Sequence, residues 1–196
     1  MVEGNNQILN IKKTKELIVD FRRKGPIPPL IYIDNAAVER VHTFKYLGLH
    51  LTNMLTWRVN TMHTIKKAHQ RLYFLKKLKG AGMSTAILKS FYRCGVESIL
   101  PSCITVWYCS TVAEKQALQR VVNSAQRIIG CSLPSLSTIY ITRCKDRAAS
   151  IMKDPTHPAH GLFTLLPSGR RLRIIRARTT RLRNTFYLDA IRLLNC

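Results

Sequence analysis

The stretch Phe44-Lys45-Tyr46-Leu47-Gly48-Leu49-His50-Leu51 decides how the first part of the chain is expected to fold. Apolar and aromatic residues alternate here with other residues at a period of two, which is typical of a β-strand. The three leucines would point to one face of this strand, and Phe44 and Tyr46 to the other. Gly48 interrupts the row at a place where a backbone or a ligand can come close. We therefore predict a single strand over this stretch.

The residues before this strand predict further short strands. Residues 16–21 form a β-rich apolar run, and the proline-rich segment 25–29 ends it. Two more apolar runs, 31–33 and 37–41, flank the favourable turn pair Asp34-Asn35, so we expect a hairpin there. On pattern alone these strands form a small antiparallel meander, and such a meander need have no function beyond folding.

Residues 57–80 predict a long basic helix that ends at Gly80-Ala81-Gly82. Its apolar residues recur at helical spacing along one stripe: Ile65, Ala68, Leu72 and Leu75. Four of its lysines lie outside the stripe, two opposite to it and two on its flanks: Lys66 and Lys77, then Lys67 and Lys76. These lysines form either a solvated face or a surface that contacts a phosphate backbone without reading its sequence.

Capping signals predict three more helices. Ser84 can cap a helix whose apolar residues continue to Pro101. The capping box Thr111-Val112-Ala113-Glu114 begins a helix that ends at Gly130. A further helix is expected over residues 135–153, because an Asp-Pro pair follows it.

The charge of the chain points to a polyanionic partner. It has 32 lysines and arginines against 10 acidic residues, a formal net charge of +22, and most of the surplus lies after residue 56. Such a surplus attracts polyanions, so RNA or DNA is the first partner to consider. Apolar residues make up 46% of the chain, which argues against disorder throughout. The longest apolar run, 96–109, is broken by Pro101 and too short to span a bilayer, so no membrane partner is expected.

An arginine-rich arm follows the last of these helices. It carries seven arginines and no acid: Arg170, Arg171, Arg173, Arg176, Arg178, Arg181 and Arg183. Guanidinium groups suit phosphates, so we expect this arm to bind nucleic acid, with the first five as candidate contacts. A disordered basic linker and a nuclear-localisation signal are the alternatives. Residues 185–195 are expected to form a short element docked on the core.

Several motifs together resemble the polymerases of non-LTR, LINE-type retrotransposons, after their catalytic loop. The family pattern is Leu-Asn-x-x-Lys-Thr-Lys, then an apolar strand ending in Asp-Phe, a hairpin and a Phe-x-Tyr-Leu-Gly strand. The residues that match in this order are Leu9, Asn10, Lys13, Thr14, Lys15, Asp20, Phe21, Phe44, Tyr46, Leu47 and Gly48. The resemblance implies the last palm strands and the thumb of a reverse transcriptase. It places Lys13 near the incoming triphosphate and the Phe44–Gly48 hairpin at the primer end, and it makes Lys15 a further candidate contact.

The tail resembles the segment that follows the thumb in fish-type LINE polymerases. The matching blocks are Arg143-Cys144, Asp154-Pro155-Thr156-His157-Pro158-Ala159-His160 and Leu166-Pro167-Ser168-Gly169-Arg170-Arg171. A similar block resembles the region labelled as the N-terminal domain of an AlkB-like alkylation-repair protein. Ferrous oxygenases need two histidines and a carboxylate, usually beginning His-x-Asp. None of the six histidines is followed by an acid two positions on, so this domain would lack catalytic residues of its own.

The carboxylates of a polymerase active site are missing as well. Nucleotide polymerisation uses two magnesium ions held by clustered carboxylates, and a reverse transcriptase supplies an adjacent aspartate pair. The aspartates of this chain are nowhere adjacent: Asp20, Asp34, Asp146, Asp154 and Asp189. We expect no catalytic residue and no cofactor here, although the parent polymerase would use magnesium. The resemblance adds an upstream catalytic half as a second partner.

The six cysteines have no paired pattern, and no signal peptide precedes them. They predict reduced thiols in an intracellular protein, cytoplasmic, nuclear or both. Cys131, Cys144, His157 and His160 are of the right types to bind zinc. Their spacing lacks the close cysteine pair of common zinc fingers, so this zinc site is a weak hypothesis. A buried thiol and two loop histidines are the alternative.

Together these patterns predict an α+β chain that is mostly α. A small antiparallel palm remnant is expected at residues 1–56, thumb-like helices at 57–110, a helical region at 111–153 and the arginine-rich tail at 154–196. Three hypotheses about function stay open. The chain is a nucleic-acid-binding fragment of a retrotransposon polymerase, an enzyme of the polymerase or AlkB-like kind, or the product of a degenerate element with no molecular role.

Overall fold

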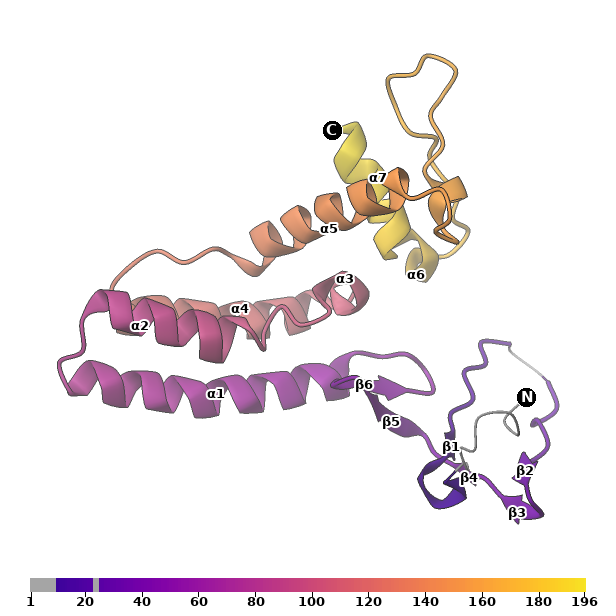
Figure 1. Cartoon of the computed structure of the whole chain (residues 1–196), viewed down its shortest axis with the longest axis horizontal. Coiled ribbons are helices and arrows are strands. Elements are labelled where there is room, and N and C mark those ends of the chain that lie inside the picture. Colours follow the sequence, from indigo (N-terminus) through magenta and orange to yellow (C-terminus); the bar gives the residue numbers. More distant parts are fainter. Residues whose placement is uncertain (1–9, 23–24) are drawn as a thin grey trace. The chain divides into compact units, whose positions relative to one another are not determined.

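The computed structural model describes residues 10–22 and 25–196, so Leu9 of the polymerase-like motif lies outside the described residues. The chain forms two compact units, residues 1–60 and 61–196. Helices account for 52% of the structure, and the strands are short (Figure 1). The predicted class, α+β and mostly α, is therefore confirmed.

The first unit contains only two-stranded ladders in its described part. Strand β1 (Lys15–Glu16) pairs in parallel with β4 (Glu39–Arg40). Strands β2 (Tyr32–Ile33) and β3 (Ala36–Ala37) form an antiparallel hairpin. A short 3-10 helix, η2 (Ile11–Lys13), precedes them, capped by the side chain of Asn10. The expected meander is thus divided into separate ladders, and one of them is parallel.

The hairpin about Asp34-Asn35 is confirmed. Both residues adopt positive φ, 47° and 62°, as a two-residue type I′ turn requires. Aspartate and asparagine tolerate this conformation better than other non-glycine residues. The longer strands expected on either side are wrong. The run 16–21 forms a strand only at its first residue, and the run 37–41 is divided between β3 and β4.

The prediction of one strand over residues 44–51 is also wrong. The structure folds this stretch into a hairpin of β5 (Thr43–Tyr46) and β6 (Leu49–Thr52), with Leu47-Gly48 as the turn. Both turn residues have positive φ, 46° and 87°, and Leu47 is 81% exposed. Phe44 pairs with Leu51 and Tyr46 with Leu49, so these four side chains share one face instead of pointing to opposite faces. Alternation at period two cannot distinguish a strand from a tight hairpin, because the period continues through both strands.

The second unit is helical, and its helix boundaries follow the capping signals. Helix α1 (Arg58–Gly80) leads into it, and the other longer helices are α2 (Thr85–Phe91), α4 (Val112–Ile129), α5 (Leu136–Lys153) and α7 (Phe186–Asn195). Shorter helical turns are η3 (Tyr92–Glu97), α3 (Ile104–Trp107), η4 (His160–Leu162) and α6 (Thr180–Arg183). Across residues 10–22 and 25–196 no helix has both the length and the apolar character needed to cross a bilayer.

Most of the predicted helix ends are confirmed by hydrogen bonds, but the helix predicted from Ser84 to Pro101 is α-helical only to Phe91 and continues as the π-helix η3 to Glu97. The Ser84 side chain accepts a hydrogen bond from the Ile87 amide, and Thr111 and Glu114 form a complete capping box. Gly82 has φ of 75°, and the amides of Gly82 and Met83 donate to the carbonyls of Lys79 and Leu78. This is the Schellman pattern that satisfies the last carbonyls of a helix, so α1 ends where its two glycines predict.

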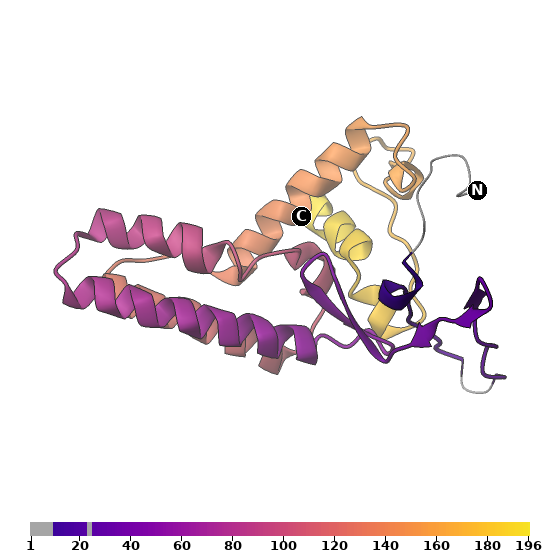
Figure 2. The same ribbon diagram turned by 60° about the horizontal axis from the view of Figure 1, so that its bottom comes forward.

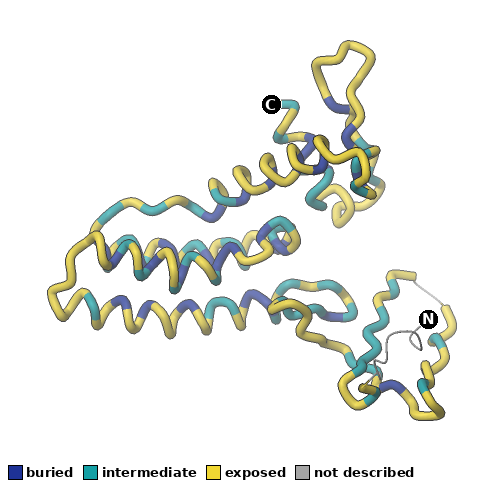
Figure 3. The backbone as a smooth tube through the Cα atoms, in the orientation of Figure 1, coloured by how far each residue is buried: buried dark blue, intermediate teal, exposed yellow. Residues whose placement is uncertain are grey.

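The core of the second unit begins with α1, α2 and α4, which run side by side (Figures 1 and 2). The predicted stripe of α1 is covered: Ala68 and Leu75 are fully buried, Leu72 is 7% exposed and Ile65 is half-buried. Figure 3 shows buried stretches alternating with exposed ones along α1. Leu88 of α2 and five residues of α4 are buried too: Leu118, Val121, Val122, Ala125 and Ile129.

A second apolar cluster lies where α5 meets α7. Its buried residues come from these helices and from the segment between them: Ala148, Ile151, Ala159, Phe163, Leu172, Ala190 and Ile191. The C-terminal element predicted over residues 185–195 is therefore confirmed as a helix docked on the core. The cluster also includes Leu172, so it holds the arginine-rich arm at one point.

Replacing Leu75 with alanine should destabilise the helical unit strongly. The side chain is fully buried, and large-to-small changes at such sites cost about 2–5 kcal/mol. Urea unfolding of the full chain measures this loss. The matched control is Leu182→Ala, because Leu182 is 46% exposed, and it should cost less than about 1 kcal/mol. Equal losses in the two variants would contradict the buried position of the α1 stripe.

Tyr92 predicts a loss of stability at high pH. Burial, with a smaller effect of the Glu97 charge, raises the pKa of the Tyr92 phenol from 10.0 to about 12. The folded chain therefore holds this proton more tightly than the unfolded chain. Its contribution to the free energy of unfolding is complete below pH 10 and is lost between pH 10 and 12.

Over that interval the free energy of unfolding should fall more in the wild type than in Tyr92→Phe, by about 2–3 kcal/mol. Urea unfolding at both pH values measures the difference between the two proteins. Parallel curves for the wild type and the variant would contradict the raised pKa.

Candidate nucleic-acid interface

The outward surface of α1 is the strongest candidate for contact with a polyanion. The helix contains seven basic residues and no acidic residue: Arg58, Lys66, Lys67, Arg71, Lys76, Lys77 and Lys79. The four predicted lysines, Lys66, Lys67, Lys76 and Lys77, are all exposed. Within the part of the chain that the structure describes, none of these seven side chains makes an ion pair. Their charge is therefore not neutralised locally.

Two exposed aromatic residues on α1 belong to the same surface. Tyr73 and Phe74 are 57% and 51% exposed, and their rings pack edge to face at 5.7 Å. The Lys77 ammonium lies 5.5 Å from the centre of the Tyr73 ring. Helical spacing puts Lys66, Tyr73 and Lys77 on one line opposite the buried stripe. That spacing was available in the sequence, but the prediction considered only the lysines.

The arginine-rich arm is anchored where it begins. Leu165 and Leu172 form an antiparallel bridge, and the Arg173 amide donates to the Thr164 carbonyl at 2.7 Å. The side chain of Asn195 in α7 binds both backbone groups of Leu172. Its Oδ1 accepts from the Leu172 amide at 2.8 Å, and its Nδ2 donates to the Leu172 carbonyl at 3.0 Å. Over residues 164–173 the arm is thus a hairpin-like loop fixed to α7 rather than a free linker.

All five predicted arginines of the arm are exposed: Arg170, Arg171, Arg173, Arg176 and Arg178. Considering residues 10–22 and 25–196, none of the five forms an ion pair with a carboxylate. The loop between Leu165 and Leu172 turns at Gly169, which has φ of 67°. Arg170 and Arg171 directly follow this turn, so the structure presents two adjacent guanidinium groups at a loop end.

The candidate contact residues of the first unit differ in their ion pairing and in the elements that carry them. Lys13 is exposed in η2, but Lys15 forms an ion pair with Glu39, which neutralises part of its charge. Phe44 and Tyr46 are exposed on one face of β5, and Gly48 lies in the turn that follows. Lys13 lies in η2 and Lys15 in β1, whereas the two aromatic residues lie in β5, so these candidates are divided among three elements of the first unit.

The structure does not gather the four residues of the zinc hypothesis. Cys131 precedes α5 and His157 follows it, and a helix of 18 residues is about 27 Å long. Cys144 is fully buried inside that helix, and burial raises the pKa of its thiol, which opposes the thiolate that zinc needs. His160 lies against the carbonyl of Ile151 at 3.2 Å. No group of three or more metal-binding side chains occurs in residues 10–22 and 25–196.

Hydrogen bonds order the region around Cys144. The Tyr140 hydroxyl donates to the Asp189 carboxylate at 3.0 Å, and Asp189 also pairs with Arg192 at 2.9 Å. Burial raises the pKa of Tyr140, so its hydroxyl stays protonated as a donor. The Tyr140 ring stacks on Tyr108 at 4.0 Å between centres. This network joins α5 to α7, so it supports the docking of the C-terminal helix.

One protein family matches part of the chain. The family model for the N-terminal region of alkylated DNA repair protein alkB homolog 8 matches residues 57–98. This span contains α1, α2 and η3, and so includes the basic surface of α1, but it covers less than a quarter of the chain. A search of curated proteins and a search of solved structures each found no significant match. The match supports the AlkB-like resemblance, but it lies at residues 57–98 and not in the tail, where the sequence had suggested it. The comparisons give no support to the resemblance to LINE-type polymerases.

Proposed function

We propose that the chain is a nucleic-acid-binding module without catalytic residues of its own, of the kind found beside alkylation-repair enzymes. The observation that carries this proposal is the exposed cationic face of α1. Seven basic residues, no acid and two exposed aromatic rings lie on a helix whose apolar stripe is buried. The family match supports the link to repair, because it spans this helix and names an alkylated DNA repair protein.

The geometry favours contact with the phosphate backbone rather than with base edges. Lysine ammonium groups on a rigid helix neutralise phosphates and carry no sequence information. The arginines of the arm add a second cationic surface, and their planar groups can bind phosphate oxygens in pairs. Binding of this kind releases counterions, so its affinity falls steeply as the salt concentration rises. The proposal therefore specifies RNA or DNA of any sequence.

Catalysis is assigned to another chain or domain because the required arrangement of side chains is missing from this sequence. A ferrous oxygenase of the AlkB kind needs two histidines and a carboxylate on one face of the metal. No histidine here is followed by an acid two positions later, and no two aspartates are adjacent. The module would act by holding nucleic acid for an enzyme that supplies the chemistry.

Replacing Lys66 and Lys77 with glutamine tests the α1 surface. Each phosphate contact adds about 0.9 to the slope of log affinity against log salt concentration. Loss of both lysines should therefore reduce the magnitude of this slope by about 2 on duplex DNA. Fluorescence anisotropy with a labelled duplex at several salt concentrations measures it.

The matched control changes Lys145 and Lys153, two exposed lysines of α5, in the same way. This control removes the same net charge but leaves α1 intact, so its slope should change by less than about 1. Equal changes in the two double variants would assign the binding to net charge rather than to α1. Binding that does not respond to salt would contradict the proposal itself.

A second candidate is a fragment of a LINE-type reverse transcriptase. The observation that favours it is the β5–β6 hairpin, whose turn falls at the Leu-Gly pair of the Phe-x-Tyr-Leu-Gly motif and leaves Phe44 and Tyr46 exposed. The genomic sequence immediately upstream tests this candidate. An in-frame aromatic-x-Asp-Asp motif there would favour the polymerase, and an oxygenase or methyltransferase reading frame would favour the repair module.

A further inference from the structure

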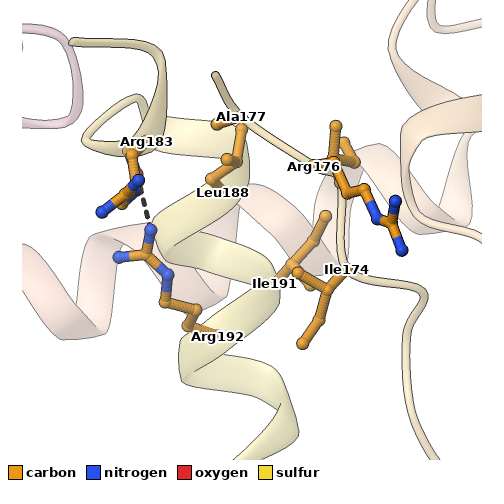
Figure 4. Close-up of a pocket in the computed structure, with 8 residues that line it drawn as sticks. Ile174, Arg176, Ala177, Arg183, Leu188, Ile191 and Arg192 are labelled. Atoms are coloured by element: carbon orange, nitrogen blue, oxygen red, sulfur yellow. Dashed lines mark hydrogen bonds between the residues drawn. The ribbon is translucent and has the colours of Figure 1, made fainter. Parts of the chain in front are cut away.

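A cavity lies between the arginine-rich arm and α7, and no residue of α1 is among those that line it (Figure 4). Its volume is about 250 Å³, and its apolar lining includes Ile174 from the arm and Leu188 and Ile191 from α7. Three arginines also line it: Arg176, Arg183 and Arg192. The cavity thus combines an apolar interior with a cationic rim. That combination suits a ligand with one flat apolar part and one negative charge.

The arginines at the rim differ in how they are held. Arg192 pairs with Asp189 at 2.9 Å and donates to the Arg183 carbonyl at 2.7 Å, so its position is fixed (Figure 4). Arg176 and Arg183 are exposed, and no carboxylate pairs with either of them in the described part of the chain. Figure 4 shows the side chains of Arg183 and Arg192 on one side of the cavity and that of Arg176 on the other. The unpaired positive charge is therefore at the entrance and not in the interior.

We propose that this cavity binds one unpaired nucleotide of a nucleic acid strand. Its base would enter the apolar interior, and its phosphate would lie on Arg183 or Arg176. This inference rests on the proposed nucleic-acid binding and adds a preference for bulged or single-stranded positions. At about 250 Å³ the cavity is smaller than the usual pockets for drug-sized ligands, so a single base is a suitable occupant. A paired base cannot enter, because it would have to leave its stack first.

The expected gain follows from the energetics of bases on apolar and aromatic surfaces. Stacking on an aromatic side chain changes affinity by roughly 5- to 150-fold per base, and the aliphatic lining of this cavity should give a gain near the lower end of that range. The full chain should therefore bind a duplex with a single-nucleotide bulge more tightly than the same duplex without the bulge, by a factor in this range. A bulge that lacks its base provides the key comparison. This base-free bulge keeps the flexible backbone, so the chain should bind it no more tightly than the plain duplex.

The variant Ala177→Trp tests the cavity without changing charge. Ala177 lines the cavity and is half-buried in a non-helical segment, so a large side chain there would occupy the space meant for the base. The ratio of bulged to plain affinity, measured by anisotropy at one salt concentration, should fall towards one. The control Ala149→Trp places the same side chain at an exposed position of α5 and should retain the wild-type ratio.

A second variant, Arg183→Gln, keeps the test decisive if Ala177→Trp fails to fold as judged by circular dichroism. It removes one exposed guanidinium at the rim and should also lower the ratio. Equal wild-type affinities for the plain and bulged duplexes would overturn the cavity proposal and leave the proposed function standing. A preference that persists with the base-free bulge, or in both variants, would overturn it as well. Failure to bind either duplex would reject both proposals.

Discussion

Burial of the apolar stripe of α1 is the constraint on which the helical unit depends. Fully burying a leucine-sized side chain stabilises a fold by about 1.5–3 kcal/mol, and Leu72 and Leu75 are both buried. Because the stripe fixes how α1 is rotated about its own axis, it also determines which side chains remain outside. The ammonium groups of the lysines opposite the stripe therefore face the solvent or a bound polyanion. The same contact thus sets both stability and the cationic surface.

The charge of the molecule has a cost for stability. A net charge of +22 on 196 residues repels itself in the compact state, and ion pairs such as Lys15–Glu39 and Arg40–Glu16 offset a small part of this surplus. A bound polyanion offsets this repulsion and stabilises the folded chain in proportion to its affinity and concentration. The capped helix ends and the partly buried Tyr140–Asp189 hydrogen bond hold the helices together without using this surplus charge. The basic side chains therefore remain available for binding.

The sequence predicted the helices well because their signals are local. Ser84, the Thr111–Glu114 box and Gly130 each act within one helical turn, and the structure has helix ends at all three. The strands were predicted less well because pairing is not local. Alternation in residues 44–51 continues through a hairpin as readily as through one strand, and the Leu47-Gly48 turn depends on a backbone conformation that the alternation does not show.

The same difference between local and long-range signals applies to the candidate site. The four candidate lysines of α1 could be predicted because one helix displays them all, and helical spacing could also have identified Tyr73. The cavity beside α7 could not be predicted, because Ile174 and Ile191 meet only after the C-terminal helix has docked on α5. The Asn195 contact that anchors the arm joins residues 23 positions apart and has no signal in the sequence. The docking of α7 thus determines the cavity and the anchor of the arm, which sequence patterns do not predict.

The most direct test of the central claim is chemical modification of lysines in the full chain, with and without saturating duplex DNA, read out by peptide mass spectrometry. The account predicts that Lys66 and Lys77 react readily in the free protein and are protected in the complex. Lys145 and Lys153, exposed on α5, should be protected much less. Equal protection of all four lysines, or unprotected Lys66 and Lys77 in a fully formed complex, would contradict the assignment of the interface to α1.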